Sequence, residues 1–390
     1  MEISANIHYV GVNDHGIDLF EGQFAVPNGM AYNSYLLIDE KTAVMDSVGA
    51  GFGDEWLANI RSALGEKSPD YLVVQHMEMD HSANIMRFAE AYPGAKIVSS
   101  KMAFTMMKSY FGTDFADRQI VVAEGSRLEL GAADGARTLT FIAAPNVHWP
   151  EVIMTYDGAE KTLFSADAFG TFGANDRNDV EDWEREARRY YFGIVGAFGA
   201  QAQAALKKAA ALDIERICAL HGPVLDKGIA HYLSIYSTWA GYGVESGGVV
   251  IAYASVYGNT KAAAEKLADI LRAKGCPAVS VRDLARADIH ECVAEAFRYG
   301  SLVLAAPTYN GGVFPAMRDF IEQLTERNYQ NRNIALIENG SWAPAAAKAM
   351  RTLFGKSAGI SFAKTDVTIK IAVTSETVSR LESLADELLA

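Results

Sequence analysis

The C-terminal part of the chain alternates short apolar runs with amphipathic stretches, and few folds accommodate this regular order. The apolar runs have the length of strands and lie at residues 249–254, 278–282, 301–306, 333–338 and 367–371. The amphipathic stretches have helical periodicity and lie at residues 260–274, 288–298, 314–327, 343–354 and 375–389. Five βα units in succession predict a parallel sheet covered by helices on both faces, with ligands bound outside the C-terminal ends of its strands.

The first part of the chain has a different texture, in which short strands and turns up to about residue 165 are interrupted by amphipathic helices. This mixture predicts an α/β sandwich with ligand sites at strand ends. A chain of 390 residues is too long for one compact core, and residues 242–248 are rich in glycine. We therefore predict one domain at residues 1–246 and a second at residues 247–390.

A cluster of metal-binding side chains follows the apolar run at residues 71–74. His76, Glu78, Asp80 and His81 lie within six positions. If the backbone is still extended at His76, then His76 and Glu78 point to the same side, and Asp80 and His81 lie on the turn that follows. Crowded carboxylates need a cation to balance their charge, so packing alone is a poor explanation. The segment can offer two ligands to each of two metals.

Three further candidates, His148, Asp167 and His221, each follow an apolar run. Taken alone, each has an ordinary reading as a loop acid or a capping histidine. Together with the first cluster they make four histidines and three carboxylates, which suits two metals that share a carboxylate. Two divalent ions would be balanced by the three carboxylates and one bridging hydroxide. Asp167 is alone on its loop and is the candidate for the bridge.

The first strand of the C-terminal part ends in a segment of small and hydroxylated residues. Backbone N–H groups and hydroxyls in such a segment surround a phosphate at a helix N-terminus, where the helix dipole favours an anion. There is no lysine, so a phosphate monoester is a better ligand than a nucleoside triphosphate. The residues of this predicted phosphate loop are Ser255, Val256, Tyr257, Gly258, Asn259 and Thr260.

These segments resemble the flavodiiron proteins, also called A-type flavoproteins. Four segments look like the metallo-β-lactamase-fold domain of that family. They are His76-x-Glu78-x-Asp80-His81, His148-Trp149-Pro150, Ser165-Ala166-Asp167-Ala168-Phe169-Gly170 and His221-Gly222-Pro223. The FMN phosphate loop of flavodoxins is similar to Tyr253-x-Ser255-x-x-Gly258-x-Thr260, although Ala252 is smaller than the residue usual there. The resemblance implies an N-terminal metallo-β-lactamase-like αββα sandwich, followed by a C-terminal flavodoxin-like, five-stranded, doubly wound parallel sheet.

The resemblance also implies the cofactors, FMN and two non-haem iron ions. It assigns metal binding and catalysis to His76, Glu78, Asp80, His81, His148, Asp167 and His221. Zinc hydrolases of the same fold carry a histidine in place of Glu78, and a carboxylate there favours iron. The flavin ring would lie between two further loops, made of Pro307, Thr308, Tyr309, Asn310, Gly311, Gly312, Asn339, Gly340, Ser341 and Trp342.

The implied activity is the reduction of dioxygen to water, of nitric oxide to nitrous oxide, or of both. Electrons would pass from an external donor through FMN to the diiron site. The three cysteines form no CxxC pair, so no rubredoxin module is expected within this chain, and the donor would be a separate rubredoxin or a reduced deazaflavin. Flavodiiron proteins assemble head to tail, so we expect a homodimer or a homotetramer.

The net charge of −13 and the pI near 5.1 argue against nucleic acid or an anionic membrane as the main partner. The N-terminus lacks a basic start and an apolar core, and no apolar stretch is long enough to span a bilayer, so we expect a cytoplasmic protein. Two alternatives are a zinc hydrolase of the metallo-β-lactamase fold with an appended flavodoxin-like electron-transfer domain, and a non-catalytic electron carrier.

Overall fold

The structure is a computed structural model that describes residues 2–131, 136–177 and 183–390. It divides into two compact units, Met1–Ser237 and Thr238–Ala390. The domain limits predicted from the sequence, 1–246 and 247–390, place the boundary slightly later in the chain.

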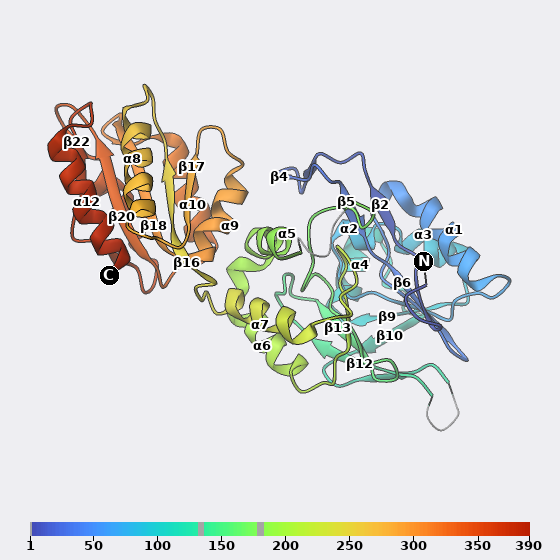
Figure 1. The fold of residues 1–390 in the computed structure, drawn as a ribbon. Coiled ribbons are helices and arrows are strands. Elements are labelled where there is room, and N and C mark those ends of the chain that lie inside the picture. The colour runs from blue at the N-terminus through green and yellow to red at the C-terminus, as the bar shows by residue number, and fades with distance from the viewer. Residues whose placement is uncertain (1, 132–135, 178–182) are drawn as a thin grey trace. The chain divides into compact units, whose positions relative to one another are not determined.

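Two β-sheets form the centre of the first unit (Figure 1). One has the strand order β1 (Ile7–Tyr9), β6 (Tyr35–Ile38), β7 (Thr42–Met45), β8 (Tyr71–Val73), β9 (Lys96–Ser100), β10 (Gln119–Val122). The other has the order β11 (Arg127–Glu129), β12 (Thr138–Ala143), β13 (Ile153–Asp157), β14 (Thr162–Phe164), β15 (Arg216–Cys218). Two short pairs are also present, β2 (Val12–Asp14) with β5 (Met30–Tyr32) and β3 (Leu19–Phe20) with β4 (Phe24–Ala25).

The core of the first unit lies between the two sheets. Met45 and Val73 of the first sheet belong to one buried cluster with Phe141, Ile153 and Phe164 of the second. Because neighbouring strand residues point to opposite faces, each sheet also has an outer face that helices cover. The αββα layering expected from the sequence is confirmed.

Seven helices accompany these sheets among the described residues. They are α1 (Gly53–Leu64), α2 (Met79–Ser82), α3 (Ile85–Ala91), α4 (Lys101–Phe111), α5 (Trp183–Tyr190), α6 (Gly199–Ala209) and α7 (Ile229–Ala240). The local sequence sets the ends of α4, because the Ser100 hydroxyl accepts a hydrogen bond from the Ala103 N–H and Gly112 takes a left-handed φ of 74° after the last turn.

The second unit contains one sheet with helices on both faces (Figure 1). Its main strand order is β17 (Val279–Asp283), β16 (Ser246–Tyr253), β18 (Tyr299–Tyr309), β20 (Asn333–Asn339), β21 (Ser361–Phe362). These strands are parallel, β22 (Val367–Ile369) also pairs in parallel with β20, and only β19 (Gly312–Val313) is antiparallel. The expected parallel sheet is confirmed; the strand predicted at residues 367–371 corresponds to β22, and β21 is a further short strand that also pairs with β20.

Figure 1 shows α8 (Asn259–Ala273) and α12 (Ser375–Leu389) together on one side of this sheet, and α9 (Ile289–Arg298) and α10 (Pro315–Glu326) on the other. The fifth helix is α11 (Ala346–Leu353). Leu267 of α8 and Leu384 of α12 are fully buried in one cluster with Ile251 of the inner strand β16. Burial on both faces explains why these strands are continuously apolar rather than alternating.

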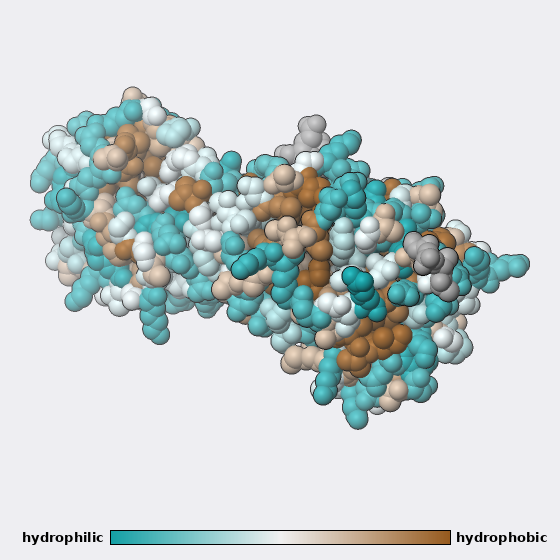
Figure 2. Space-filling model, turned by 90° about the horizontal axis from the view of Figure 1, so that it is seen from below, coloured by the Kyte–Doolittle hydropathy of each residue, from teal (hydrophilic) through white to brown (hydrophobic). Residues whose placement is uncertain are grey.

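The outer surface is mainly hydrophilic, with apolar side chains gathered in a few patches on the face shown in Figure 2. Within the part of the chain that the structure describes, none of the helices combines the length and the apolar character that a membrane span requires.

Candidate metal centre and flavin loops

The seven predicted metal ligands meet at one end of the first unit. His76 follows β8, and Glu78 is the residue before α2, which carries Asp80 and His81. The loops that follow β12, β14 and β15 bring the remaining three, His148, Asp167 and His221. The two sheets face each other with these strand ends at the same edge, so segments far apart in sequence converge.

The first group of side chains contains His76, Glu78, His148 and Asp167. The Nε2 atom of His76 lies 3.3 Å from Glu78 Oε2 and 3.1 Å from Asp167 Oδ2. The Nε2 atom of His148 lies 3.0 Å and 3.3 Å from the same two oxygens. Two imidazole nitrogens and two carboxylate oxygens therefore face a common centre, an arrangement that could hold one metal ion.

The second group contains Asp80, His81 and His221. Asp80 Oδ2 lies 3.2 Å from the Nε2 atom of each histidine, and the two Nε2 atoms are 2.9 Å apart. Asp167 joins the two groups, because its Oδ1 atom lies 3.8 Å from His81 Nε2 and 3.7 Å from His221 Nε2 while Oδ2 faces the first group. One carboxylate thus presents one oxygen to each group.

Two of the imidazole rings are held from behind by buried acceptors. The Nδ1–H of His76 donates to Glu151 Oε1 at 2.8 Å, and the Nδ1–H of His221 donates to the backbone carbonyl of Ala31 at 2.7 Å. With Nδ1 carrying the proton, each ring turns the lone pair of its Nε2 atom toward the centre. This is the orientation that a metal-binding histidine needs.

Buried oxygen atoms without hydrogen-bond partners provide a test of whether the site fits metal ions. Both carboxylate oxygens of Asp80 and both of Asp167 are buried and receive no hydrogen bond within the described residues. Burial of a carboxylate is costly unless a cation or a donor balances it. The donor set of imidazoles and carboxylates therefore fits a pair of metal ions.

The charged neighbours shift the pKa values of these groups when no metal is bound. Burial opposes charge on His76, but the Asp167 carboxylate outweighs burial and raises the pKa of His76 well above its ordinary value. Burial likewise acts to raise the pKa of Asp167, yet His76 and His148 hold it well below the usual range. Against burial, Asp167 and Glu78 raise the pKa of His148 to about 9. Metal binding must displace these imidazole protons.

Two supporting carboxylates, Glu151 and Asp46, were missed by the sequence analysis. Besides holding His76, Glu151 Oε1 accepts a hydrogen bond from the Met77 N–H at 2.8 Å. Asp46 accepts from the backbone N–H of Gln75 at 2.7 Å and from its side-chain amide at 2.9 Å, which fastens the loop that carries His76. In the sequence, Asp46 is marked only as an acid at the end of the strand-like run 42–46. Glu151 is marked only as an acid three positions after His148.

Aromatic rings line the back of the site. Phe20, Tyr32 and Tyr190 lie around His221, with ring centroids 5.4, 6.0 and 5.5 Å from the imidazole. Trp149 lies 5.3 Å from the ring of His76. These rings cover the imidazoles of His221 and His76. The side chains of Glu78 and Asp80 are 21% and 15% exposed, so each group of ligands has one side chain that reaches the surface.

The predicted flavin loops meet at the C-terminal edge of the sheet in the second unit. The segment 255–260 links β16 to α8, where Gly258 has a φ of 90° and donates its N–H to Ser255 Oγ at 3.1 Å. Thr260 in the first turn of α8 is buried and lies 3.5 Å from the side-chain amide of Asn339 at the end of β20. An anion at this helix N-terminus would meet these hydroxyls and backbone donors.

The other two loops place aromatic side chains at the surface. Trp342 is 92% exposed and Tyr309 is 45% exposed, and Tyr257, in the segment 255–260, is also 92% exposed. Large exposed aromatic side chains beside a phosphate loop provide faces on which a flat ring can stack. The strand β18 extends to Tyr309 and turns back through β19, so Pro307, Thr308 and Tyr309 belong to a hairpin rather than to an irregular loop.

Comparison with known proteins finds two matching domains in the chain. Residues 30–222 match the ODP family beta lactamase domain, and residues 250–364 match a flavodoxin domain. The rubredoxin-oxygen oxidoreductase of Megalodesulfovibrio gigas is 29% identical, over 99% of this chain and 96% of its own. A nitric oxide reductase of Moorella thermoacetica is 30% identical, over 89% and 88% of the two chains. The crystal structure of the flavodiiron protein from Giardia intestinalis matches with a TM-score of 0.90 at 25% identity, covering 100% of this chain and 96% of that chain.

Fold and site therefore define a two-domain protein in which a β-lactamase-like metal-binding domain is joined to a flavodoxin domain. The chain belongs to the flavodiiron protein family, and it is an oxidoreductase. The flavodoxin domain indicates FMN as a cofactor, and membership of the family indicates a non-haem pair of iron ions.

Proposed function

We propose that this chain reduces dioxygen to water, nitric oxide to nitrous oxide, or both. The first reaction consumes four electrons and four protons for each dioxygen, and the second consumes two electrons and two protons for each pair of nitric oxide molecules. The names of two relatives, a rubredoxin-oxygen oxidoreductase and a nitric oxide reductase, support these two gases as substrates. Electrons pass from an external donor through FMN to the diiron site.

The observation that carries this proposal is the position of Asp167 between the two groups of ligands. We assign one iron to His76, Glu78, His148 and Asp167, and the other to Asp80, His81, His221 and Asp167. Glu78 brings the number of carboxylates to three and makes the donor set rich in oxygen, which favours iron over zinc. When bound by these residues, two irons would supply adjacent redox-active centres for the reduction of a diatomic gas.

The protein itself orients and protects this centre. Glu151 and the Ala31 carbonyl fix two of the imidazoles, and the rings of Tyr32 and Tyr190 pack against His221. The partly exposed side chains of Glu78 and Asp80 leave access for a small uncharged substrate without an elaborate pocket. Selectivity then depends on the metals and on access to them rather than on shape recognition of the substrate.

We assign FMN to three segments at the edge of the second sheet. Its phosphate is bound by residues 255–260, and its ring lies between residues 307–312 and residues 339–342 against Trp342 or Tyr309. The buried Thr260 and the exposed aromatic side chains support this assignment. The electron donor is a separate rubredoxin or a reduced deazaflavin, and the name of the Megalodesulfovibrio relative supports rubredoxin.

We further propose a head-to-tail homodimer, alone or paired into a homotetramer, in which the flavin of one subunit faces the iron pair of the other. A cytoplasmic location fits the three cysteines, all of which are free, because reducing compartments keep thiols unpaired.

The deciding experiment combines metal analysis with gas turnover. Protein purified without oxygen should contain about two irons per chain if all seven ligands serve a pair of metals. Reduced with rubredoxin, it should consume dioxygen or nitric oxide and release little peroxide. Zinc in place of iron together with ester or thioester hydrolysis would support the hydrolase alternative, and slow oxidation with release of peroxide would support a simple electron carrier.

A further inference from the structure

Two neighbouring loops supply Asp167 and His221 to the metal centre. They are the bridge loop, residues 165–175, and the histidine loop, residues 219–222. The strands that precede these loops, β14 and β15, are parallel neighbours in the second sheet. Because parallel strands end at the same edge of a sheet, the two loops leave it side by side. The distance between the two ligands therefore depends on how firmly these loops are joined.

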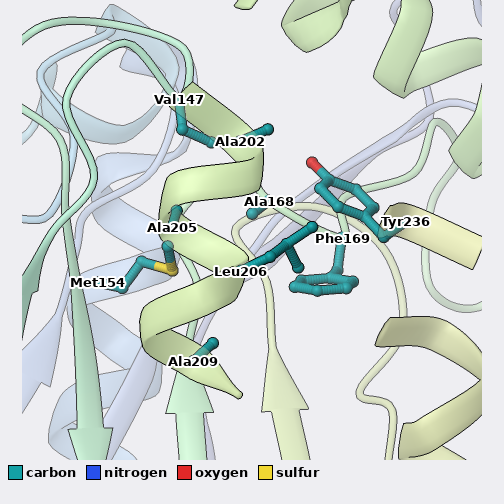
Figure 3. A pocket seen from close by; sticks show the side chains of 9 residues that line it. All are labelled: Val147, Met154, Ala168, Phe169, Ala202, Ala205, Leu206, Ala209 and Tyr236. Atoms are coloured by element: carbon teal, nitrogen blue, oxygen red, sulfur yellow. The ribbon is translucent and has the colours of Figure 1, made fainter. Parts of the chain in front are cut away.

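Apolar packing holds the bridge loop on the side that faces α6. Ala168 and Phe169 follow Asp167 in the chain and are almost fully buried. Figure 3 shows both residues beside α6, with the ring of Tyr236 next to that of Phe169, and the two ring centroids are 4.3 Å apart. Close packing of this kind leaves the loop little freedom on that side.

Asn33 joins the histidine loop to the bridge loop. It lies between β5 and β6 and is fully buried. Its side-chain NH₂ group donates to the carbonyls of Ala219 and Gly222, the two ends of the histidine loop, at 2.9 and 2.7 Å. Its Oδ1 atom accepts a hydrogen bond from the side-chain amide of Asn175, at the end of the bridge loop, at 2.9 Å. The Asn33 backbone N–H also donates to the Leu220 carbonyl at 2.8 Å.

The chemistry of this position is specific to an amide. An amide offers two N–H donors and one carbonyl acceptor, and in Asn33 each of them has a partner. Leucine and aspartate have a similar shape, but leucine carries no polar atom and an aspartate carboxylate has no donor. Without the amide, the buried carbonyls of Ala219 and Gly222 would lose hydrogen bonds, which is costly for buried polar groups.

The second group of ligands depends strongly on the placement of His221. The Nδ1–H of His221 is held by the Ala31 carbonyl at 2.7 Å. The Nδ1 atom of His81, the other imidazole of this group, is buried and has no hydrogen-bond partner within the described part of the chain. One of the two rings is thus fixed from behind, and its acceptor lies two positions before Asn33.

We propose that Asn33 is a positioning residue for the second metal, because its amide locks the histidine loop to the bridge loop and so fixes His221 relative to Asp167. This inference rests on the proposed function, which assigns the second iron to Asp80, His81, His221 and Asp167. Asn33 acts through the two loops and does not bind the metal. Three of the four ligands of the first metal come from other segments, so the first metal depends on Asn33 much less.

The first test measures iron release and needs no turnover. The full chain, loaded with iron and FMN, is treated with a chelator in the absence of oxygen, and the iron that remains is counted over time. In Asn33→Ala, one iron per chain should leave about 10- to 100-fold faster than in the native protein, and the other at close to the native rate. Release of both irons at native rates, or equal acceleration of both, overturns the proposal.

Mössbauer spectra identify which iron leaves. The iron that remains in chelated Asn33→Ala should have the spectrum of the iron held by His221→Ala, which lacks a ligand of the second group. A spectrum that matches His148→Ala, which lacks a ligand of the first group, overturns the proposal. A role of Asn33 in folding alone would not select one of the two irons.

The matched control is Asn59→Ala. The side-chain amide of Asn59 in α1 likewise donates to two backbone carbonyls, those of Val10 and Gly11 at 3.3 and 3.1 Å, but it bonds neither of the two loops. Both irons should leave this variant at native rates. If Asn33→Ala fails to fold, Asn175→Ala removes only the contact to the bridge loop and should accelerate loss of the same iron by a smaller factor. Acceleration no greater than in Asn59→Ala overturns the proposal.

The outcomes separate this inference from the proposed function. If the native protein holds a pair of irons and Asn33→Ala releases both at native rates, the role of Asn33 is overturned and the proposed function stands. If the native protein holds no pair of irons, the proposed metal assignment is overturned, and the role of Asn33 falls with it.

Discussion

At the scale of single residues, the metal site depends on groups that do not reach the centre themselves. Glu151 is fully buried, and one of its oxygens serves both the His76 ring and the backbone of Met77. The first contact fixes which nitrogen of His76 carries the proton, and the second fixes the loop. Such supporting carboxylates raise the basicity of the imidazole and orient it.

Replacing Glu151 with glutamine tests this role. The amide oxygen can still accept a hydrogen bond, but the negative charge next to His76 is lost. We expect Glu151→Gln to lower iron affinity about 10- to 100-fold, as is common for partners of metal-binding histidines. The measurement is the rate of iron loss to a chelator, with FMN content as the check on folding.

The matched control is Glu90→Gln, at an exposed position on α3. It makes the same chemical change away from the site and should leave iron loss at the native rate. Equal rates of iron loss from Glu151→Gln and the native protein would show that Glu151 does not support metal binding.

A second prediction at this scale concerns the pH dependence of stability without metal. Against burial, Asp167 and Glu78 raise the pKa of His148 from 6.5 to about 9. The protonated ring therefore stabilises the fold below pH 6.5, and this stabilisation is lost as the pH rises toward about 9. We expect the unfolding free energy of the iron-free protein to fall by roughly 3 kcal/mol over this interval, and its melting temperature to fall with it. His148→Gln should flatten the dependence, and a slope that persists in that variant would assign it to other groups.

At the scale of elements, both sites are built at the C-terminal ends of strands. In the second unit, β16 leads through residues 255–260 into α8, so the helix dipole and the orphan N–H groups of its first turn face the proposed phosphate. Thr260 is buried at this turn, and its hydroxyl lies within reach of Asn339 at the end of β20. Both strand ends therefore lie beside the proposed phosphate site.

We expect Thr260→Ala to weaken FMN binding about tenfold or more, because a hydrogen bond to a charged group contributes roughly 1.5–3 kcal/mol. Titration of the flavin-free protein with FMN, followed by flavin fluorescence, gives the dissociation constant. Thr352→Ala is a suitable control, because Thr352 is an exposed helical threonine of the same unit that bonds only its own helix, to the Lys348 carbonyl. Iron content should stay unchanged in both variants. If Thr260→Ala bound FMN with the affinity of the native protein, Thr260 would not contact the phosphate.

At the scale of the whole molecule, the central question is which flavin serves which iron pair. The proposed head-to-tail dimer makes each complete electron path from two subunits. Asp167→Ala should lose iron while it keeps FMN, because Asp167 belongs to the first unit alone. Thr260→Asp should lose FMN while it keeps iron, because a carboxylate repels the phosphate. Each variant alone should be inactive.

Mixing the two variants distinguishes the paths. After dissociation and random reassembly of equal amounts, head-to-tail dimers should recover about a quarter of native activity, since half of them are mixed and each mixed dimer has one complete path. A path confined to one subunit predicts no recovery. A fully active monomer, shown by light scattering under assay conditions, would equally contradict the proposed assembly.

Much of this architecture was predictable from local sequence. The βα alternation after residue 249 identified a parallel sheet, because strand and helix periodicities are local properties of the chain. The positions of His76, His148, Asp167 and His221 at the ends of apolar runs suggested a shared site, because strand ends collect at the edges of layered folds. Their role as ligands stays a prediction, although the structure brings all seven side chains together.

Only the tertiary structure decided which distant segments of the chain are in contact. The two oxygens of Asp167 facing different groups and the position of Glu151 behind His76 each depend on how the two sheets pack. No periodicity or spacing encodes these distances, because they are set by side chains that meet across more than seventy positions of sequence, such as His76 and Glu151. The sequence by itself determined which elements form and where polar side chains interrupt them, and packing determined which of those side chains meet.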